Sequence, residues 1–288
     1  MRFRLHFLPF LLAALSAAGM ARAGTATNVT GLFYTGVNNS GGLLAGGTQD
    51  SHWSVVYANA PGFDANYEGA AYVVSGSHID SAWVPNTSTA QWITAPGAST
   101  APSGGTVNAG GDYLPGNGTS GANDARYVYR LAFTISGSTS GGTTVTNNVS
   151  IALTIAADDR YRIYVNPAFS NGEIDPNAST LAASGLSAWN DTEVEYLQNF
   201  TGNGHSDNAN FVIGTNYIYV VVDNTNNLTG DSSSTALNPS GLLVYQVGSA
   251  VLIDGKPVPE VGTILPVIGA LGWFALRRFS RDKRAIVG

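Results

Sequence analysis

Two stretches with a strict two-residue alternation restrict the fold of this chain more than any other feature. From Tyr127 to Ile135, aromatic and aliphatic side chains occupy every second position, and the pattern returns from Val149 to Ile155. Because successive side chains of a β-strand point to opposite faces, each stretch predicts a strand with one buried face. The Ser, Thr and Gly residues of Gly137–Asn148 predict a hairpin loop between them. We therefore expect antiparallel pairing.

Further short apolar stretches extend this pattern along the chain. The expected strands are 32–37, 53–57, 71–75, 81–84, 91–94, 161–165, 217–222 and 242–247. Abundant Gly, Ser, Thr and Asn, with little Lys and Glu, favour strands and turns over long helices. Residues 191–200 fit a helix and a strand equally well, and 95–125 predicts a long loop. The expected fold class is all-β, a single antiparallel β-sandwich, jelly-roll-like, of about ten to twelve strands.

The first 23 residues have the composition of a secretory signal peptide. Arg2 and Arg4 precede an apolar segment, 5–18, and Ala21-Arg22-Ala23 supplies the small residues of a cleavage site. Residues 24–256 would then form the β-sandwich domain, outside the cytoplasm. The chain has no cysteine, so this domain does not depend on disulfides.

The C-terminal segment, 257–288, divides into three parts. Residues 258–263 begin with Val258, Pro259 and Glu260, an apolar run covers 261–276, and a basic tail at 277–284 begins with Arg277 and Arg278. The 16 residues of the run are close to the ~17–25 that span a bilayer. A basic flank keeps its end of such a helix in the cytoplasm. We expect a transmembrane helix that ends at a basic stop.

These three parts together resemble the PEP-CTERM sorting signal of Gram-negative bacteria that make extracellular polysaccharide. The resemblance implies an exosortase, a membrane cysteine protease, as processing partner. It also implies a transient stay in the inner membrane, followed by transfer to the cell envelope, the surface or the extracellular matrix. Val261 stands where that signal has its second proline. An ordinary one-helix membrane anchor is the alternative.

The net charge of residues 24–256, the body of the chain, limits the partners that it can bind. Between the two terminal segments, five basic residues stand against seventeen acidic ones, a net charge of −12. Such a surface repels nucleic acid and anionic lipid and suits divalent cations, so no nucleic-acid partner is expected. Neither a phosphate-binding loop nor a dinucleotide fingerprint occurs in the sequence.

Asp158 and Asp159 are the most suggestive candidates for chemistry. They lie between two expected strands, and the segment 158–166 is similar to a hairpin of protective-antigen-like domains. In yeast adhesins of that type the paired aspartates bind Ca²⁺, which then grips a sugar, so the resemblance implies calcium as a cofactor. The further oxygen ligands that Ca²⁺ needs are expected among Asp191, Asp207, Asn208, Asp223 and Asn224. The alternative is that both aspartates only shape the turn.

The tryptophans indicate where a sugar ring would stack. Trp53 and Trp92 are flanked by alternating apolar residues, which predicts burial in the core. Trp83 and Trp189 lie in loop-like sequence and are the expected ligand-binding residues.

Two aspartate–histidine pairs have the spacing of one strand face. Asp50 lies two residues before His52, and His78 two residues before Asp80. Zinc sites use such ligands, but no third partner is evident near either pair. We expect these residues to lie at the surface or to support loops.

No catalytic residues are predicted, and three functions are compatible with these features. The first is a non-enzymatic exported protein, sorted by its tail to the envelope or to an extracellular polysaccharide matrix. The second is a calcium-assisted carbohydrate-binding module. The third is a glycan-active hydrolase, which requires two carboxylates that face each other in an aromatic cleft.

Overall fold

The computed structural model describes residues 22–59, 68–74, 79, 82–96, 125–170, 173–186, 189–224, 240–246 and 251–258. Every helix or strand assigned in this part of the chain is a β-strand, which confirms the all-β prediction. The strands are β1 Arg22–Thr30, β2 Gln49–Asn59, β3 Gly69–Val73, β4 Ile93–Thr94, β5 Ala125–Val145, β6 Val149–Asp158, β7 Arg160–Val165, β8 Phe169–Ser170, β9 Glu173–Ile174, β10 Leu181–Leu186, β11 Glu193–Gln198, β12 Gly214–Asn224, β13 Gly241–Tyr245, β14 Val251–Ile253 and β15 Lys256–Pro257.

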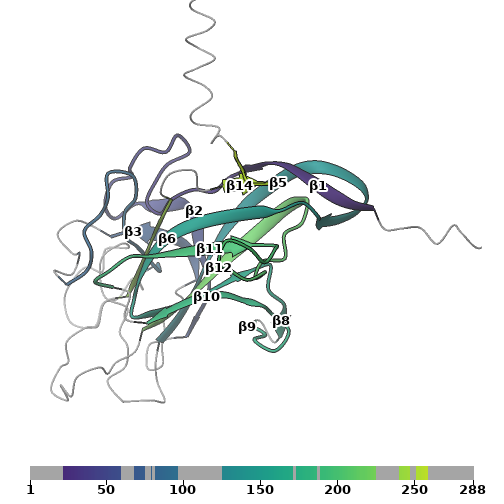
Figure 1. The fold of residues 1–288 in the computed structure, drawn as a ribbon. Coiled ribbons are helices and arrows are strands. Elements are labelled where there is room, and N and C mark those ends of the chain that lie inside the picture. The colour runs from purple at the N-terminus through teal and green to yellow at the C-terminus, as the bar shows by residue number, and fades with distance from the viewer. Residues whose placement is uncertain are drawn as a thin grey trace, which may run out of the picture.

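The strands form one curled antiparallel sheet, shown in Figure 1, with β8 and β9 as a separate hairpin. The 13-stranded sheet follows the order β10-β7-β12-β5-β2-β3-β4-β13-β6-β14-β15, while β1 pairs with β5 and β11 pairs with β6. Because the sheet curls, β10 at one end of this path contacts β11, and β12 contacts β6. The interior of the curl holds the core.

The predicted alternation builds that core. Inward-facing positions of β5 and β7 supply Tyr127, Tyr129 and Tyr161, all nearly or fully buried. Trp53 of β2 and Trp92, next to β4, are also buried, which confirms the prediction for both tryptophans. Burial of a large apolar side chain contributes about 1.5–3 kcal/mol, so these rings are a major source of stability.

The prediction of a loop at Gly137–Asn148 is wrong for most of that range. β5 continues through Gly137 to Val145 and pairs with β1, with Gly137 opposite Ala26. A Cβ on Gly137 would lie 2.2 Å from the carbonyl oxygen of Thr25, so this close approach of the two backbones requires glycine. The turn covers only residues 146–148. Backbone pairing with a strand more than a hundred residues away leaves no mark in the local composition.

Residues 193–198, equally compatible with helix and strand, are strand β11 because they pair with β6 in unbroken register. Two expected strands do not form. Residues 32–37 contain a turn in which Gly36 has a φ of 73°, and the described part of 81–84 is a turn followed by irregular chain. The other expected strands are present at bounds that differ by a few residues.

The predicted terminal segments lie almost entirely outside the described residues. Residues 1–21 and 259–288 are not described, and these include Pro259, Glu260, Arg277 and Arg278. Val258 is described, and its N–H donates to the Val251 carbonyl oxygen at 2.9 Å. Among the described residues, no helix is long and apolar enough to cross a membrane.

Candidate functional site

The structure places Asp158 and Asp159 at a corner of the sheet, as the sequence predicted. Asp158 is the last residue of β6, and Asp159 separates it from β7. Both residues are buried, with 5% and 7% of their surface exposed, and the peptide bond between them is cis. Two charges removed from water need compensation by hydrogen bonds or by opposite charge. This corner is therefore the first place to look for a bound cation.

Trp83 fixes the orientation of Asp158. Its indole Nε1–H donates to Oδ2 of Asp158 at 3.0 Å, and its ring packs against Trp92 with 4.3 Å between ring centroids. Gly241 lies against both rings, and a Cβ there would come within 2.7 Å of Trp83. The tryptophan follows a turn, as expected, but its side chain is only 7% exposed. Trp83 therefore has little free ring surface for a sugar and holds a carboxylate instead.

Trp189 joins the same aromatic cluster from a different turn. Its side chain is partly buried against the residues that surround Trp83, and its carbonyl oxygen accepts the Val84 N–H at 2.9 Å. The two tryptophans predicted from loop-like sequence are thus brought together. Part of Trp189 reaches the surface, where a ligand can contact it.

Among the five further ligands suggested from the sequence, Asn224 is the one adjacent to the aspartate pair. Asp223 of β12 stands opposite Arg160 of β7, which puts Asn224 beside Asp159. Asn224 is fully buried. On the other side, the Ser240 hydroxyl donates to the main-chain oxygen of Asp158 at 3.4 Å.

The other four suggested ligands have structural partners or lie elsewhere. Asp223 forms ion pairs with two arginines, and the Asn208 side chain bonds to three backbone groups around β11. Asp191 accepts the N–H of the following Thr192. Asp207 is exposed in the turn after β11. Asp223 meets the aspartate pair through its backbone, since its carbonyl oxygen accepts the Asp159 N–H at 3.4 Å, while its carboxylate is paired with the arginines.

The chemistry of the corner suits a hard cation. Its side-chain donors are two carboxylates and an amide, all oxygen ligands of the kind that Ca²⁺ prefers, whereas Zn²⁺ favours histidine and cysteine. Within the described residues, no group of three or more His, Cys, Asp or Glu side chains is placed to hold a metal. Ca²⁺ takes six to eight ligands and accepts carbonyl oxygens and water among them. The residues present thus fit calcium as a partial ligand set.

A second acidic cluster joins β7 to β11. The Tyr161 hydroxyl contacts Oε2 of Glu193 at very short range and Oε1 of Glu195 at 2.6 Å. Burial, followed by the two carboxylates, raises the pKa of Tyr161, and burial, with a smaller contribution from Glu193, raises the pKa of Glu195. One hydroxyl has one hydrogen, so it donates to one of the two carboxylates at a time. Both glutamates are thus engaged by the tyrosine.

Asp50 supports a loop, as predicted. Its carboxylate accepts the backbone N–H groups of Gly36 at 2.7 Å, His52 at 2.8 Å and Trp53 at 3.0 Å. The His52 ring stacks on Phe33, with 3.5 Å between ring centroids. The pair therefore fixes the chain before β2. His78 and Asp80 lie outside the described residues.

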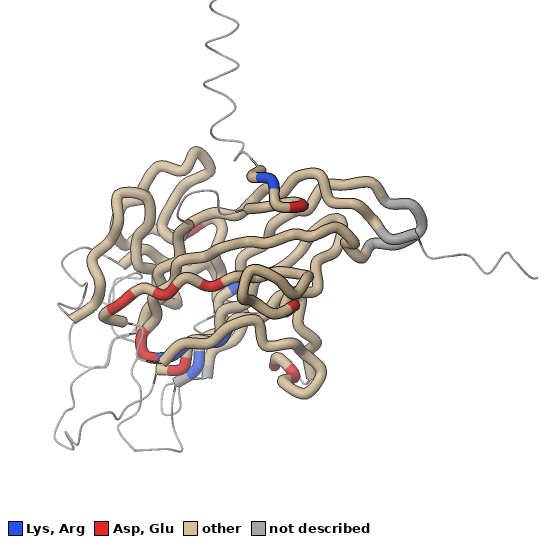
Figure 2. Tube along the Cα trace, in the orientation of Figure 1, with Lys and Arg blue, Asp and Glu red and all other residues tan. Residues whose placement is uncertain are grey.

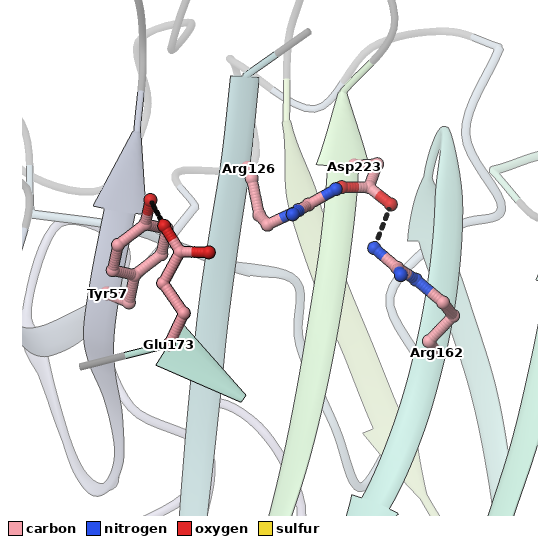
Figure 3. A network of polar contacts seen from close by, with 5 residues as sticks. All are labelled: Tyr57, Arg126, Arg162, Glu173 and Asp223. Carbon is pink, nitrogen blue, oxygen red and sulfur yellow. Dashed lines mark hydrogen bonds and ion pairs between the residues drawn. The ribbon is translucent and has the colours of Figure 1, made fainter. Parts of the chain in front are cut away.

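A polar network on the outer face of the sheet was not predicted. In Figure 3, Asp223 of β12 receives Arg126 of β5 and Arg162 of β7, each at 2.6 Å, and the Tyr57 hydroxyl donates to Glu173 at 2.6 Å. The signal was present in the sequence, since Arg126 and Arg130 of β5 are four residues apart and Arg160 and Arg162 of β7 are two residues apart. Each pair occupies one face of its strand.

Comparisons with known proteins do not assign the chain to a family. No protein-family model and no curated protein matches it. One similar solved structure comprises the cysteine protease and lectin-like domains of Cwp84, a surface layer associated protein of Clostridium difficile, at 12% identity and a TM-score of 0.18, covering 82% of this chain and 55% of that chain. Another is a clostridial cysteine protease, Cwp84 after propeptide cleavage, at 14% identity and a TM-score of 0.17, covering 78% and 60%. This chain spans less than two thirds of the length of either protein, and TM-scores this low do not show a shared fold.

Proposed function

We propose that this chain is a non-enzymatic exported protein whose β-rich body is a calcium-assisted carbohydrate-binding module. The observation that carries the proposal is the buried, adjacent pair of Asp158 and Asp159. One carboxylate is oriented by the indole N–H of Trp83, and the residue that carries the other is next to the buried Asn224 in the register of β7 and β12. A buried pair of like charges suits a divalent cation, which compensates both.

In this proposal each residue of the corner has a separate role. Asp158 and Asp159 hold the cation, with Asn224 as a further oxygen donor. A bound Ca²⁺ supplies open coordination positions to sugar hydroxyl groups. Trp83 positions Asp158, and the exposed part of Trp189 contacts the sugar ring.

The terminal segments supply the route of the proposed protein. The signal peptide at 1–23 directs export, and the PEP-CTERM-like tail, with its helix at 261–276, holds the chain in the inner membrane until an exosortase acts near Val258. The jelly-roll-like arrangement of the curled sheet belongs to the same proposal. Mass spectrometry of the exported protein tests the route: a C-terminus near 258–260 supports sorting, whereas an intact end at Gly288 indicates a plain anchor.

Calorimetry on the 24–256 body tests the calcium site. We expect Ca²⁺ to bind the wild-type body and not the Asp158→Ala/Asp159→Ala variant. The Asp207→Ala variant is a matched control, because it removes one exposed carboxylate away from the corner. Identical isotherms for the wild type and the double variant would refute the site.

A glycan array, read with calcium and with chelator, tests the sugar. Signals that require calcium and disappear in the double variant support the module. Signals that are equal with and without chelator indicate that the sugar binds elsewhere on the body. The absence of any signal would leave the chain as an exported protein with a metal site alone.

A further inference from the structure

The basic residues of the body are not spread over its surface. Of the five in 24–256, four lie on β5 and β7, and Lys256 lies on β15, the last strand of the sheet order. Figure 2 draws the Lys and Arg positions in blue. The four arginines belong to the outer face of the sheet, since the alternate positions, such as Tyr127 and Ile163, point into the core. With the two tyrosines of β12 between these strands they form the Arg/Tyr face. Its members are Arg126, Arg130, Arg160, Arg162, Tyr217 and Tyr219.

The register of the three strands sets this face out in rows. Arg126 and Arg160 stand on either side of Asp223, and Arg130 stands beside Tyr219. Neighbouring strands are about 4.8 Å apart, and alternate residues of a strand are about 6.7 Å apart. The basic row and the tyrosine row are therefore about 13 Å apart, a length that suits a short run of sugar rings laid along the strands.

The positive charge of the face exceeds what its own acids neutralise. Asp223 is shared by Arg126 and Arg162, whose side chains remain 44% and 33% exposed, so one carboxylate balances only half of that pair. Glu173, beside Arg126 in Figure 3, supplies a second negative charge. The four arginines thus leave an excess of about two positive charges, on a body whose net charge is −12.

The aromatic row is partly buried: Tyr219 is 7% exposed, whereas the neighbouring Tyr217 is partly exposed. The Arg130 guanidinium lies over the Tyr217 ring, 5.4 Å from its centroid, and Tyr219 meets the half-exposed Phe169 edge-on at 5.3 Å. Tyrosine rings stack on the apolar faces of sugars, and guanidinium groups bind carboxylates as a planar fork.

We infer that the Arg/Tyr face binds a glycan chain that carries carboxylate groups. The arginines match the carboxylates, and the partly exposed Tyr217 matches a sugar ring, while the buried Tyr219 supports it from below the surface. The phosphates of a nucleic acid also suit arginines, but the negative charge of the rest of the body repels them. The inference rests on the proposed carbohydrate-binding role, but it uses no residue of the calcium site and needs no metal.

Calorimetry with oligogalacturonate on the purified full chain, in chelator, tests this inference. We expect binding of the acid and not of its methyl ester, which has the same sugar rings without the charges. Binding should weaken as salt is raised, because exposed charges are screened. Equal binding of the acid and the ester, or no binding of either, would overturn the inference. Equal or tighter binding of poly-glutamate would also overturn it, since a peptide would then be the better occupant.

Two variants locate the binding on the face. Arg162→Gln leaves Arg126 paired with Asp223 and should weaken oligogalacturonate binding about tenfold, the loss expected for one charge-assisted contact. Tyr217→Ala should weaken it by a similar factor, while Lys256→Gln, which removes a charge elsewhere, should not. Unchanged affinity in both face variants, with unchanged melting temperatures, would refute the location.

The chelator separates this inference from the calcium site. Failure to bind in chelator overturns the Arg/Tyr face and leaves the aspartate pair untested by that result. Binding that appears only with calcium would place the glycan at Asp158 and Asp159 instead. Retention of chelator-resistant binding in the Asp158→Ala/Asp159→Ala variant supports the face even if the calcium site fails.

Discussion

Two buried aspartates, each beside a tryptophan, have different surroundings in this molecule. Asp50 accepts the backbone N–H of Trp53 and two further backbone N–H groups from its own neighbourhood. Asp158 accepts the side-chain N–H of Trp83 and has a second carboxylate directly after it in the chain. Their exposed fractions are similar, at 1% and 5%.

The difference shows that burial alone does not mark a functional carboxylate. Three backbone N–H groups stabilise the ionised carboxylate of Asp50 and hold it against the loop before β2. Burial still raises the pKa of Asp50, with the backbone donors acting in the opposite direction. At Asp158 and Asp159, charge is concentrated at a strand corner and held by a side chain, an arrangement that suits an external cation. Substitution of Asp50 should lower the stability with and without calcium, whereas substitution of Asp158 and Asp159 should remove the stabilisation by calcium.

The largest effect is expected at Asp50. Asp50→Ala leaves three backbone N–H groups without their acceptor, and we expect the free energy of unfolding to fall by about 3 kcal/mol or more. Urea denaturation measures this, and the loss should be the same with and without calcium. Asp50→Asn keeps one acceptor oxygen and should lose less. A small loss of stability in Asp50→Ala that depends on calcium would contradict this prediction, because Asp50 would then behave as Asp158 is expected to.

The second effect concerns calcium and Asp158. A ligand that binds only the folded state at a hundred times its Kd adds about 2.7 kcal/mol to the free energy of unfolding. We expect such a gain in the wild type, measured by thermal melting with calcium and with chelator. Asp158→Asn/Asp159→Asn should lose the gain while keeping the shape of both side chains. If the double variant is stabilised by calcium as much as the wild type, the cation binds elsewhere.

The strands with strong alternation were predictable because local sequence determines which of their faces is buried. β5 up to Ile135 and β6 follow this rule, and the corner at Asp158 and Asp159 lies where the end of β6 was expected. The second half of β5 was not predictable. Its Ser, Thr and Gly residues form a strand only because β1, distant in sequence, pairs with them.

The contacts of the site could be predicted only in part. That Trp53 is buried follows from its apolar neighbours, but Trp83 has a loop-like sequence and is buried by contacts with Trp92 and Gly241 from other segments. Similarly, the spacing of Arg160 and Arg162 shows that they share a face but not that Asp223 lies between β5 and β7. Such pairings depend on strand order, which single-strand periodicity does not encode.

A third, smaller effect tests the role of Trp83. Trp83→Phe keeps an aromatic ring against Trp92 but removes the N–H donor to Asp158. We expect about 1 kcal/mol lower stability, the typical contribution of one hydrogen bond, and a weaker calcium affinity measured by calorimetry. Trp92→Phe is a control that also removes an indole, whose N–H donates to the Val84 carbonyl oxygen rather than to the corner. If both variants lower calcium affinity equally, packing rather than orientation of Asp158 is responsible.

The smallest effect concerns Glu195, a carboxylate whose surroundings differ from those of Asp50 and Asp158. Glu195 is held neither by backbone donors nor next to a candidate cation, but by the Tyr161 hydroxyl, and burial raises its pKa above the ordinary 4.5. The folded state then binds a proton more tightly than the unfolded state, so this group's contribution to stability falls as pH rises from about 4.5 through the folded pKa. Glu195→Gln keeps the acceptor oxygen without the charge. We expect the variant to match the wild type near pH 4 and to exceed it by about 1 kcal/mol or less at pH 8, measured by urea denaturation at both values. A wild type that gains stability relative to the variant as pH rises would show instead that the folded state favours the ionised form of Glu195.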